Sequence, residues 1–315
     1  MCSGVRFVDN NGKMFFGRNL DWSVGYGERI LVTPRNYEYS SAFLGSLKNK
    51  YGIIGMGIVQ ENVPLYFDCG NEAGLAIAGL NFPGYANYES DAVEGKKNVA
   101  AYEFPLWILM NFSSVDEVEK ELENVAIVAK PINDKYPVSL LHWIIGDSKR
   151  SIVVEYTENG MEIFHNDADV LTNQPGYGWH KENLRNYMNL SNVQPESVKL
   201  GNVELKPFGS GSMMRGIPGD YYSTSRFVRL AYLNANYPMK ESEEDNVNKL
   251  FQLLNGVKMI EGAALMTDGN SEKTVYTGCF SEVTKTYYWN TYEDFSIKKS
   301  CMNDFDLDSS EILLG

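Results

Sequence analysis

The sequence is poor in the residues that build metal sites and disulfide scaffolds. Its 315 residues include only four cysteines and three histidines. None of them forms a C-x-x-C or H-E-x-x-H motif. The chain also lacks G-x-x-x-x-G-K-[ST] and has no G-x-G-x-x-G after a strand-like run, which argues against a nucleotide-binding fold. We therefore expect neither a metal site nor a cofactor.

Long apolar runs are missing as well. No stretch approaches the roughly 20 apolar residues that cross a bilayer, and Asp9 and Asn10 follow the first residues where a signal peptide would be apolar. We expect a cytoplasmic protein with no membrane partner. The formal net charge of −13 argues against a nucleic-acid partner, since phosphates are bound by clustered Lys and Arg. A small anionic substrate remains compatible, because one or two buried arginines can hold an anion.

The arrangement of strand-like and helix-like patterns predicts an α+β fold. The hydrophobic fraction of 43% allows a large core, and no repeat, low-complexity tract or linker marks a boundary, so we expect one domain over residues 1–315. Short runs rich in β-branched and aromatic residues predict antiparallel strands joined by hairpins. These runs are 5–8, 14–16, 29–32, 52–59, 65–67, 75–80, 151–156, 161–164, 170–172, 274–277 and 286–292.

Three segments between the strands carry helical patterns. Ser114 and Glu117 have capping-box spacing, followed by apolar residues that include Val125. A second helix, which contains Leu250, is expected to end near Gly256. A third is expected over residues 101–112, with Pro105 in its first turn.

Cys2 is the first candidate for chemistry. Removal of Met1 would leave a cysteine with a free α-amine, so one residue would carry both a nucleophile and a base. The reference pKa values of a thiol and an α-amine, about 8.5 and 7.7–8.0, lie close to working pH. The amine could accept the thiol proton and later deliver it to a leaving nitrogen. Taken alone, Cys2 is more often an ordinary second residue.

The segment Gly17-Arg18-Asn19-Leu20-Asp21-Trp22 follows the second strand-like run. An Asn11-Gly12 turn would bring that strand back beside Cys2. Arg18 near the sulfur would stabilise a thiolate, and Asp21 would anchor the α-ammonium. An exposed ion pair at a strand end is the ordinary alternative.

Several motifs together resemble the choloylglycine hydrolase family, which comprises bile salt hydrolases and penicillin V acylases. The resemblance spans essentially the whole chain and is carried by Met-Cys-Ser-Gly-Val-Arg-Phe from position 1, Phe-Gly-Arg-Asn-Leu-Asp-Trp from 16, Gly-Leu-Asn-Phe-Pro-Gly-Tyr from 79, Leu-Thr-Asn-Gln-Pro from 171, Ser-Arg-Phe-Val-Arg from 225 and Tyr-Tyr-Trp-Asn-Thr-Tyr from 287. It implies an N-terminal-nucleophile fold, a four-layer αββα sandwich with two antiparallel sheets between helices. It also implies a homotetramer.

The resemblance places the family's catalytic residues on Cys2, Arg18, Asp21, Asn81, Asn173 and Arg226. Asn81 and Asn173 would donate to the oxyanion, although each is also an ordinary turn residue. Arg226 would steady the region of Cys2 and Asn173. A rigid steroid needs an apolar, aromatic cleft. Candidates to line that cleft are Leu20, Trp22, Tyr26, Met56, Phe67 and Phe82.

The resemblance favours bile salts conjugated to glycine or taurine as small-molecule substrates. Bile salt hydrolases resemble this chain in having Asn at position 81, where penicillin acylases tend to have Tyr. The stretch 175–180 resembles the acylase version, so penicillin V is the alternative substrate. A non-catalytic binding protein that keeps Met1 is an alternative of a different class. The segment 208–219 has the glycines of a flap over the amine side, and Cys69, Cys279 and Cys301 are expected to be buried.

Overall fold

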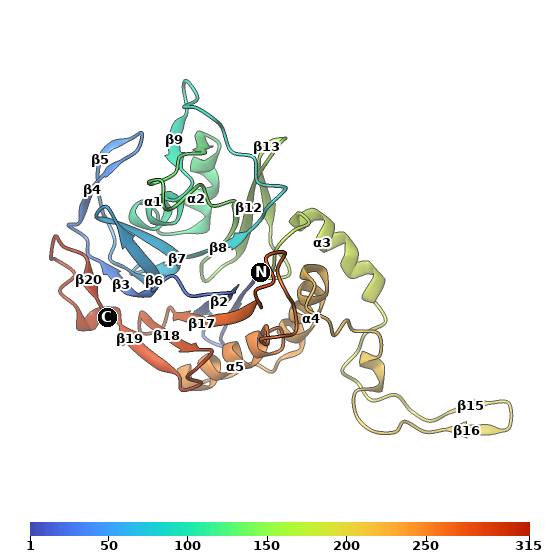
Figure 1. Ribbon diagram of the computed structural model, residues 1–315. Helices are drawn as coiled ribbons and strands as arrows, with labels where there is room; N and C mark the ends of the chain where they lie inside the picture. The colour runs from blue at the N-terminus through green and yellow to red at the C-terminus, as the bar shows by residue number, and fades with distance from the viewer.

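Two antiparallel sheets form the centre of the computed structural model, which describes all 315 residues (Figure 1). The smaller sheet has the spatial order β14 (Val170–Leu171), β1 (Cys2–Val8), β2 (Met14–Trp22), β17 (Lys273–Ser281), β18 (Thr286–Thr291) and β19 (Lys298–Cys301). The larger has the order β13 (Gly160–His165), β12 (Ser151–Thr157), β11 (Leu141–Gly146), β8 (Ala76–Asn81), β7 (Val63–Asn71), β6 (Ile53–Gln60), β3 (Arg29–Thr33) and β20 (Leu313–Leu314).

Helices cover the outer faces of both sheets. Helices α4 (Ser223–Asn236) and α5 (Glu243–Asn255) pack on the six-stranded sheet, and α1 (Phe104–Asn111) packs on the eight-stranded sheet beside α2 (Val115–Leu122). The predicted α+β sandwich of four layers is therefore confirmed. No helix is both long and apolar enough to cross a membrane.

The remaining elements are short. Three two-stranded pairs accompany the sandwich: β4 (Glu38–Ser41) with β5 (Gly45–Lys48), the parallel pair β9 (Lys97–Ala100) with β10 (Val125–Val128), and β15 (Val198–Leu200) with β16 (Val203–Leu205). The other helices are α3 (Tyr177–Asn183) and the 3-10 turns η1 (Leu184–Tyr187), η2 (Ser212–Met214) and η3 (Met302–Asp304). The β15–β16 hairpin extends away from the sandwich as an arm (Figure 1).

Two glycines allow the layers to approach closely. A Cβ atom at Gly4 would lie 3.3 Å from Ile144 Cγ2 of the facing sheet. A Cβ at Gly17 would lie 2.7 Å from Leu250 Cδ2 on α5 and 2.2 Å from the Gly278 carbonyl oxygen. The backbone of β2 is thus enclosed by the facing layers, and β2 carries Arg18 and Asp21.

The three predicted helices are present with three corrections, the first of which is that α1 begins at Phe104 and not at residue 101. Helix α5 ends at the predicted Gly256, and Pro105 lies in the first turn of α1. Ser114 caps α2 by accepting from the Glu117 amide at 3.3 Å, whereas Glu117 accepts from the neighbouring Ser113 amide and so does not complete the expected box. The expected helical stretch to Val125 was wrong. Helix α2 ends at Leu122, and Val125 begins β10 because its buried residues pair with β9.

Leu250 tests the packing of α5 on the six-stranded sheet. The Leu250→Ala substitution should lower the free energy of unfolding by about 2–5 kcal/mol, because it leaves a cavity at a fully buried position. Leu265→Ala is the matched control at an exposed loop position and should change the free energy of unfolding by less than about 0.5 kcal/mol. Urea unfolding measures both, and similar small losses would contradict this account of the layer.

Candidate active site

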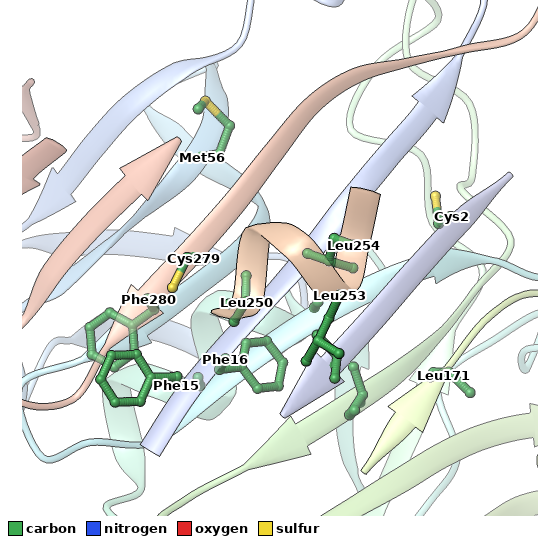
Figure 2. Packing of buried hydrophobic residues seen from close by; sticks show 14 of the residues in the cluster. Cys2, Phe15, Phe16, Met56, Leu171, Leu250, Leu253, Leu254, Cys279 and Phe280 are labelled. Carbon is green, nitrogen blue, oxygen red and sulfur yellow. The ribbon is translucent and has the colours of Figure 1, made fainter. Parts of the chain in front are cut away.

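Cys2 begins β1 and lies at the edge of the packed interior. It pairs with Leu20 across the hairpin, and its side chain is buried. The expected turn at Asn11-Gly12 is present, and the Asp9 carboxylate accepts from two of its amides, at 2.8 Å each. Figure 2 shows Cys2 at one end of the apolar cluster and Phe15, Phe16 and Phe280 at the other. The β1–β2 hairpin thus places the Cys2 sulfur at one end of the apolar cluster.

Arg18 holds the Cys2 sulfur. Its Nη2 atom donates to Cys2 Sγ at 2.7 Å, and Nη1 donates to the carbonyl oxygens of Gly79 at 2.7 Å and Phe67 at 3.2 Å. The guanidinium is 1% exposed and has no carboxylate oxygen within 4.0 Å. Burial opposes its charge, but the neighbouring Cys2, Tyr276 and Asp68 raise the pKa of Arg18 above its ordinary value. A buried cation without a carboxylate stabilises the thiolate as its counterion.

Asp21 lies on the opposite face of β2 from Arg18 and is also buried. Its Oδ1 accepts from Thr274 Oγ1 at 2.6 Å, whereas Oδ2 has no hydrogen-bond partner and lies 4.0 Å from Arg226 Nη1. Burial raises the pKa of Asp21 above its usual range. The Met1 ammonium donates to the Asp21 backbone carbonyl at 2.8 Å and contacts the carboxylate of Glu272.

Arg226 and Asn173 hold the backbone of Cys2. Arg226, on the first turn of α4, donates to the Cys2 carbonyl at 2.5 Å and to Asn173 Oδ1 at 2.7 Å. The Cys2 amide donates to the same Asn173 oxygen at 2.7 Å. Asn173 Nδ2 donates to the Asn81 carbonyl at 2.7 Å. The Asn81 side chain itself is half-buried and forms no hydrogen bond within the protein. The structure thus brings the six predicted catalytic residues together.

The predicted cleft residues fall into two groups. Trp22 is half-buried at the end of β2, and Tyr26 is 44% exposed in the loop that follows. The Tyr26 ring meets the half-buried Phe67 ring edge to face at 5.6 Å, and the Phe67 carbonyl binds Arg18. This aromatic group is open to a ligand beside the site. The other candidates, Leu20, Met56 and Phe82, are buried.

The burial of Phe82 and of the other three cysteines can be compared with the predictions for these residues. Phe82 is fully covered because its ring stacks on His142 at 4.1 Å and 10°. Cys69 and Cys279 are buried as expected, but the expectation for Cys301 was wrong: it is only partly buried at the end of the edge strand β19. In segment 208–219, Phe208 is fully exposed and η2 forms a short turn. No group of three or more His, Cys, Asp or Glu side chains is arranged to bind a metal ion.

The sequence interpretation missed the residues behind Asn173. His180 Nε2 bonds the Asn173 carbonyl at 2.9 Å, and Ser223 Oγ accepts from the Asn173 amide at 2.9 Å. His142 bonds the preceding carbonyl, that of Thr172, at 2.8 Å. The three histidines lack the spacing of metal ligands and carry no other recognisable pattern. His142 and His180 are 38 positions apart in the sequence, so nothing in the sequence indicates that both contact one segment.

Comparisons with known proteins show what this chain is similar to. Residues 2–315 match the family described as linear amide C–N hydrolases, choloylglycine hydrolase family. The chain is 54% identical over 99% of both chains to a bile salt hydrolase/transferase of Bifidobacterium longum, and 43% identical over 99% of both to a conjugated bile acid hydrolase of Lactobacillus acidophilus. The crystal structure of the C2A mutant of conjugated bile acid hydrolase from Clostridium perfringens matches with a TM-score of 0.94 and 38% identity, covering 100% of this chain and 96% of that one. A penicillin V acylase from Agrobacterium tumefaciens shares the fold, with a TM-score of 0.79 and 20% identity over 99% of this chain and 90% of that one.

The contact between Arg18 and the sulfur predicts the reactivity of Cys2. Arg18→Gln should slow iodoacetamide alkylation of Cys2 at pH 7 by about tenfold, since that factor corresponds to ~1.4 kcal/mol of lost thiolate stabilisation. Mass spectrometry of the N-terminal peptide separates Cys2 from the other cysteines. Arg229→Gln is the control. Arg229 lies on α4 and donates only to backbone carbonyl oxygens, those of Pro218, Asp220 and Gly256, and it does not contact Cys2. Equal alkylation rates in the two variants would contradict the assignment.

Proposed function

Because the chain belongs to the choloylglycine hydrolase family of linear amide C–N hydrolases, we propose that it hydrolyses the amide bond of bile salts conjugated to glycine or taurine. The observation that carries the proposal is the buried Cys2 sulfur at 2.7 Å from a guanidinium that has no carboxylate partner. Such a thiol is prepared for attack on an amide carbonyl. Relatives at 54% and 43% identity are named for hydrolysis of bile salts or conjugated bile acids.

Catalysis requires removal of Met1. While Met1 is attached, the nitrogen of Cys2 is an amide that donates to Asn173 and cannot accept a proton. Removal of Met1 would leave an α-amine at the Cys2 nitrogen, next to Asn173 Oδ1 and near the carboxylate of Asp21. Asp21 Oδ2 is buried without a partner, and an unsatisfied buried oxygen costs about 1–3 kcal/mol. An α-ammonium would supply the missing donor, and this orphaned oxygen supports the processed form.

The reaction then proceeds through an acyl-enzyme. The α-amine of Cys2 takes the thiol proton, the sulfur attacks the amide carbon, and the carbonyl π electrons move to oxygen. The half-buried Asn81 side chain has no protein partner, so its amide is free to donate to that oxygen. Asn173 Nδ2 uses one hydrogen on the Asn81 carbonyl and keeps the second for the same purpose.

Collapse of the intermediate breaks the C–N bond. The leaving nitrogen takes a proton from the α-ammonium of Cys2, which releases glycine or taurine and leaves a thioester. Water then attacks the thioester carbon, the amine accepts its proton, and the bile acid departs as Cys2 is regenerated. All protons pass through groups of the chain and water, so the reaction balances without an oxidant or reductant.

Trp22, Tyr26 and Phe67 suit the steroid side of this substrate. Tyr26 and Phe67 pack edge to face next to the carbonyl that binds Arg18, and Trp22 is half-buried at the end of β2. A rigid apolar slab gains affinity from such surfaces. Penicillin V is a second substrate to test, because residues 175–180 resemble the acylase version of that segment.

Assembly and location complete the proposal: a homotetramer that works in the cytoplasm. Assembly is supported by the β15–β16 arm, on which Val198, Leu200 and Val203 are each more than half exposed. Apolar side chains gathered on a projecting hairpin need a protein surface to cover them. Light scattering measures the mass in solution directly, and a monomer would contradict this part of the proposal.

Processing predicts the mass of the active enzyme. Intact-mass spectrometry should find that active protein lacks one methionine relative to the full chain, because only then is the nitrogen of Cys2 an amine. Chemical acetylation of that amine should abolish turnover. Full activity in protein that keeps Met1 would exclude the proposed base.

Substitution of the nucleophile predicts a complete loss of turnover. Cys2→Ala should remove hydrolysis of glycocholate and taurocholate, while the circular dichroism spectrum shows that the fold is retained. Cys301→Ala, at a partly buried cysteine remote from Arg18, is the control and should keep wild-type rates. Values of kcat/KM for glycocholate, taurocholate and penicillin V then rank the substrates. Turnover of penicillin V alone would overturn the bile salt assignment.

A further inference from the structure

Asp68 links the two sheets beside the active site. It lies on β7 of the eight-stranded sheet and is 2% exposed. Its Oδ1 accepts from the Tyr276 hydroxyl on β17, and its Oδ2 accepts from the Tyr287 hydroxyl on β18 at 2.5 Å. Both tyrosines are buried and belong to the six-stranded sheet. The proposed reaction uses none of these three side chains.

The three side chains share the space between the sheets with Arg18. Arg18 pairs with Gly278 of β17, and residues paired in an antiparallel ladder point to the same face. Tyr276 is two residues before Gly278 and points to that face as well. A Cβ atom at Gly278 would overlap Tyr287 Oη and lie 3.1 Å from Asp68 Oδ2. The hydroxyl and the carboxyl group therefore fill the space over the strand partner of Arg18.

A β-bulge directly precedes Asp68. Tyr66 and Asp68 pair with consecutive residues of β6, so Phe67 is an extra residue without a partner in that ladder. The carbonyl oxygen of Phe67 accepts from Arg18 Nη1 at 3.2 Å. The bulge thus supplies one of the acceptors that hold the guanidinium.

A second bulge directly precedes Tyr276 in the facing sheet. Thr274 and Tyr276 pair with consecutive residues of β2, so Val275 is the extra residue there. The hydrogen bond between Tyr276 and Asp68 joins the residues that follow the two bulges. Bulges bend strands and re-aim side chains near active sites. This hydrogen bond fixes the two bent segments relative to each other.

Arg18 depends on the position of the Phe67 carbonyl because its guanidinium is planar and rigid. Nη1 binds that carbonyl, and Nη2 donates to Cys2 Sγ at 2.7 Å. A shift of the carbonyl would turn the guanidinium plane and move Nη2 away from the sulfur. The same carbonyl belongs to the peptide bond that joins Phe67 to Asp68. The hydrogen bonds of Asp68 therefore hold that peptide in place.

We propose that Asp68, held by Tyr276 and Tyr287, is a positioning residue that directs Arg18 toward the Cys2 sulfur. It forms no hydrogen bond with the sulfur and acts through the Phe67 carbonyl. This role needs a hydrogen bond from each phenol group to Asp68 and is the same wherever the shared protons lie. Its effect on turnover rests on the proposed function, whereas its effect on the reactivity of Cys2 does not.

Tyr276→Phe and Tyr287→Phe test the proposal, since each removes one hydroxyl and keeps the ring. Each variant should slow iodoacetamide alkylation of Cys2 at pH 7 by about three- to tenfold, because a tenfold loss corresponds to one unit in the pKa of the thiol. The midpoint of the pH profile of alkylation should move upward, since a thiol that loses its contact with a cation ionises at higher pH.

Tyr66→Phe is the matched control. Tyr66 also lies on β7 and is buried, but its hydroxyl bonds Thr33 Oγ1 at 2.6 Å in the hydrophobic cluster on the other face of the sheet. All three variants lose one buried hydrogen bond, so each should lower the urea midpoint. Only Tyr66→Phe should keep the wild-type alkylation rate and pH profile.

Substitution of Asp68 separates hydrogen bonding from charge. Asp68→Ala removes both hydrogen bonds and should slow alkylation at least as much as either tyrosine variant. Asp68→Asn offers one acceptor and one donor, and phenol oxygens can donate or accept, so it can bind both tyrosines. It should restore the rate toward that of the wild type. Alkylation as slow in Asp68→Asn as in Asp68→Ala would overturn the positioning role.

Equal alkylation rates in Tyr276→Phe, Tyr287→Phe and Tyr66→Phe would also overturn the proposal. If Asp68→Ala does not fold, the tyrosine variants still decide the outcome. In Tyr276→Phe and Tyr287→Phe, kcat for glycocholate should fall by the same factor as alkylation, with little change in KM. A wild-type enzyme that turns over no bile salt would refute the proposed function and leave the alkylation test intact.

Discussion

The contact between the Arg18 guanidinium and the Cys2 sulfur constrains the rest of the structure. A guanidinium that is 1% exposed costs several kcal/mol of desolvation unless its donors are satisfied. Here they bind the sulfur and the carbonyl oxygens of Phe67 and Gly79, which belong to the facing sheet. The same contacts therefore cross-link the two sheets and fix the nucleophile. Moving either sheet would leave a buried cation without its acceptors.

The two faces of β2 carry different charged residues of the site. Arg18 points between the sheets toward the sulfur, and Asp21 points toward the layer of α4. The Cys2 side chain lies on the Arg18 face, because Cys2 pairs with Leu20, which is two residues from Arg18 along β2. Thiol and backbone nitrogen are thus held from opposite sides, the first by one cation and the second through Asn173 and Arg226. Strand alternation alone produces this separation.

Sequence patterns predicted those features of the fold that depend on interactions between residues close together in the sequence. The turn at Asn11-Gly12, the antiparallel strands and the Gly256 end of α5 depend on neighbours in the sequence. The motifs likewise led to the six residues that meet around Cys2. Sequence patterns gave wrong predictions where contacts between residues far apart in the sequence determine the secondary structure or the burial. Val125 looks helical by spacing but pairs with β9, and Phe82 looks available but is covered by His142, which is 60 residues later in the sequence.

Asn173 is the point at which these distant contacts meet. Its carboxamide accepts from Cys2 and Arg226 and donates to Asn81, so its orientation leaves no freedom to flip without losing three hydrogen bonds. Its backbone is held by Ser223 and His180, from two helices. An amide fixed on all sides before the substrate arrives needs little reorganisation as charge develops, which is the property required of an oxyanion donor. The polar residues buried around it are costly to fold, and this preorganisation gives a physical reason to keep them.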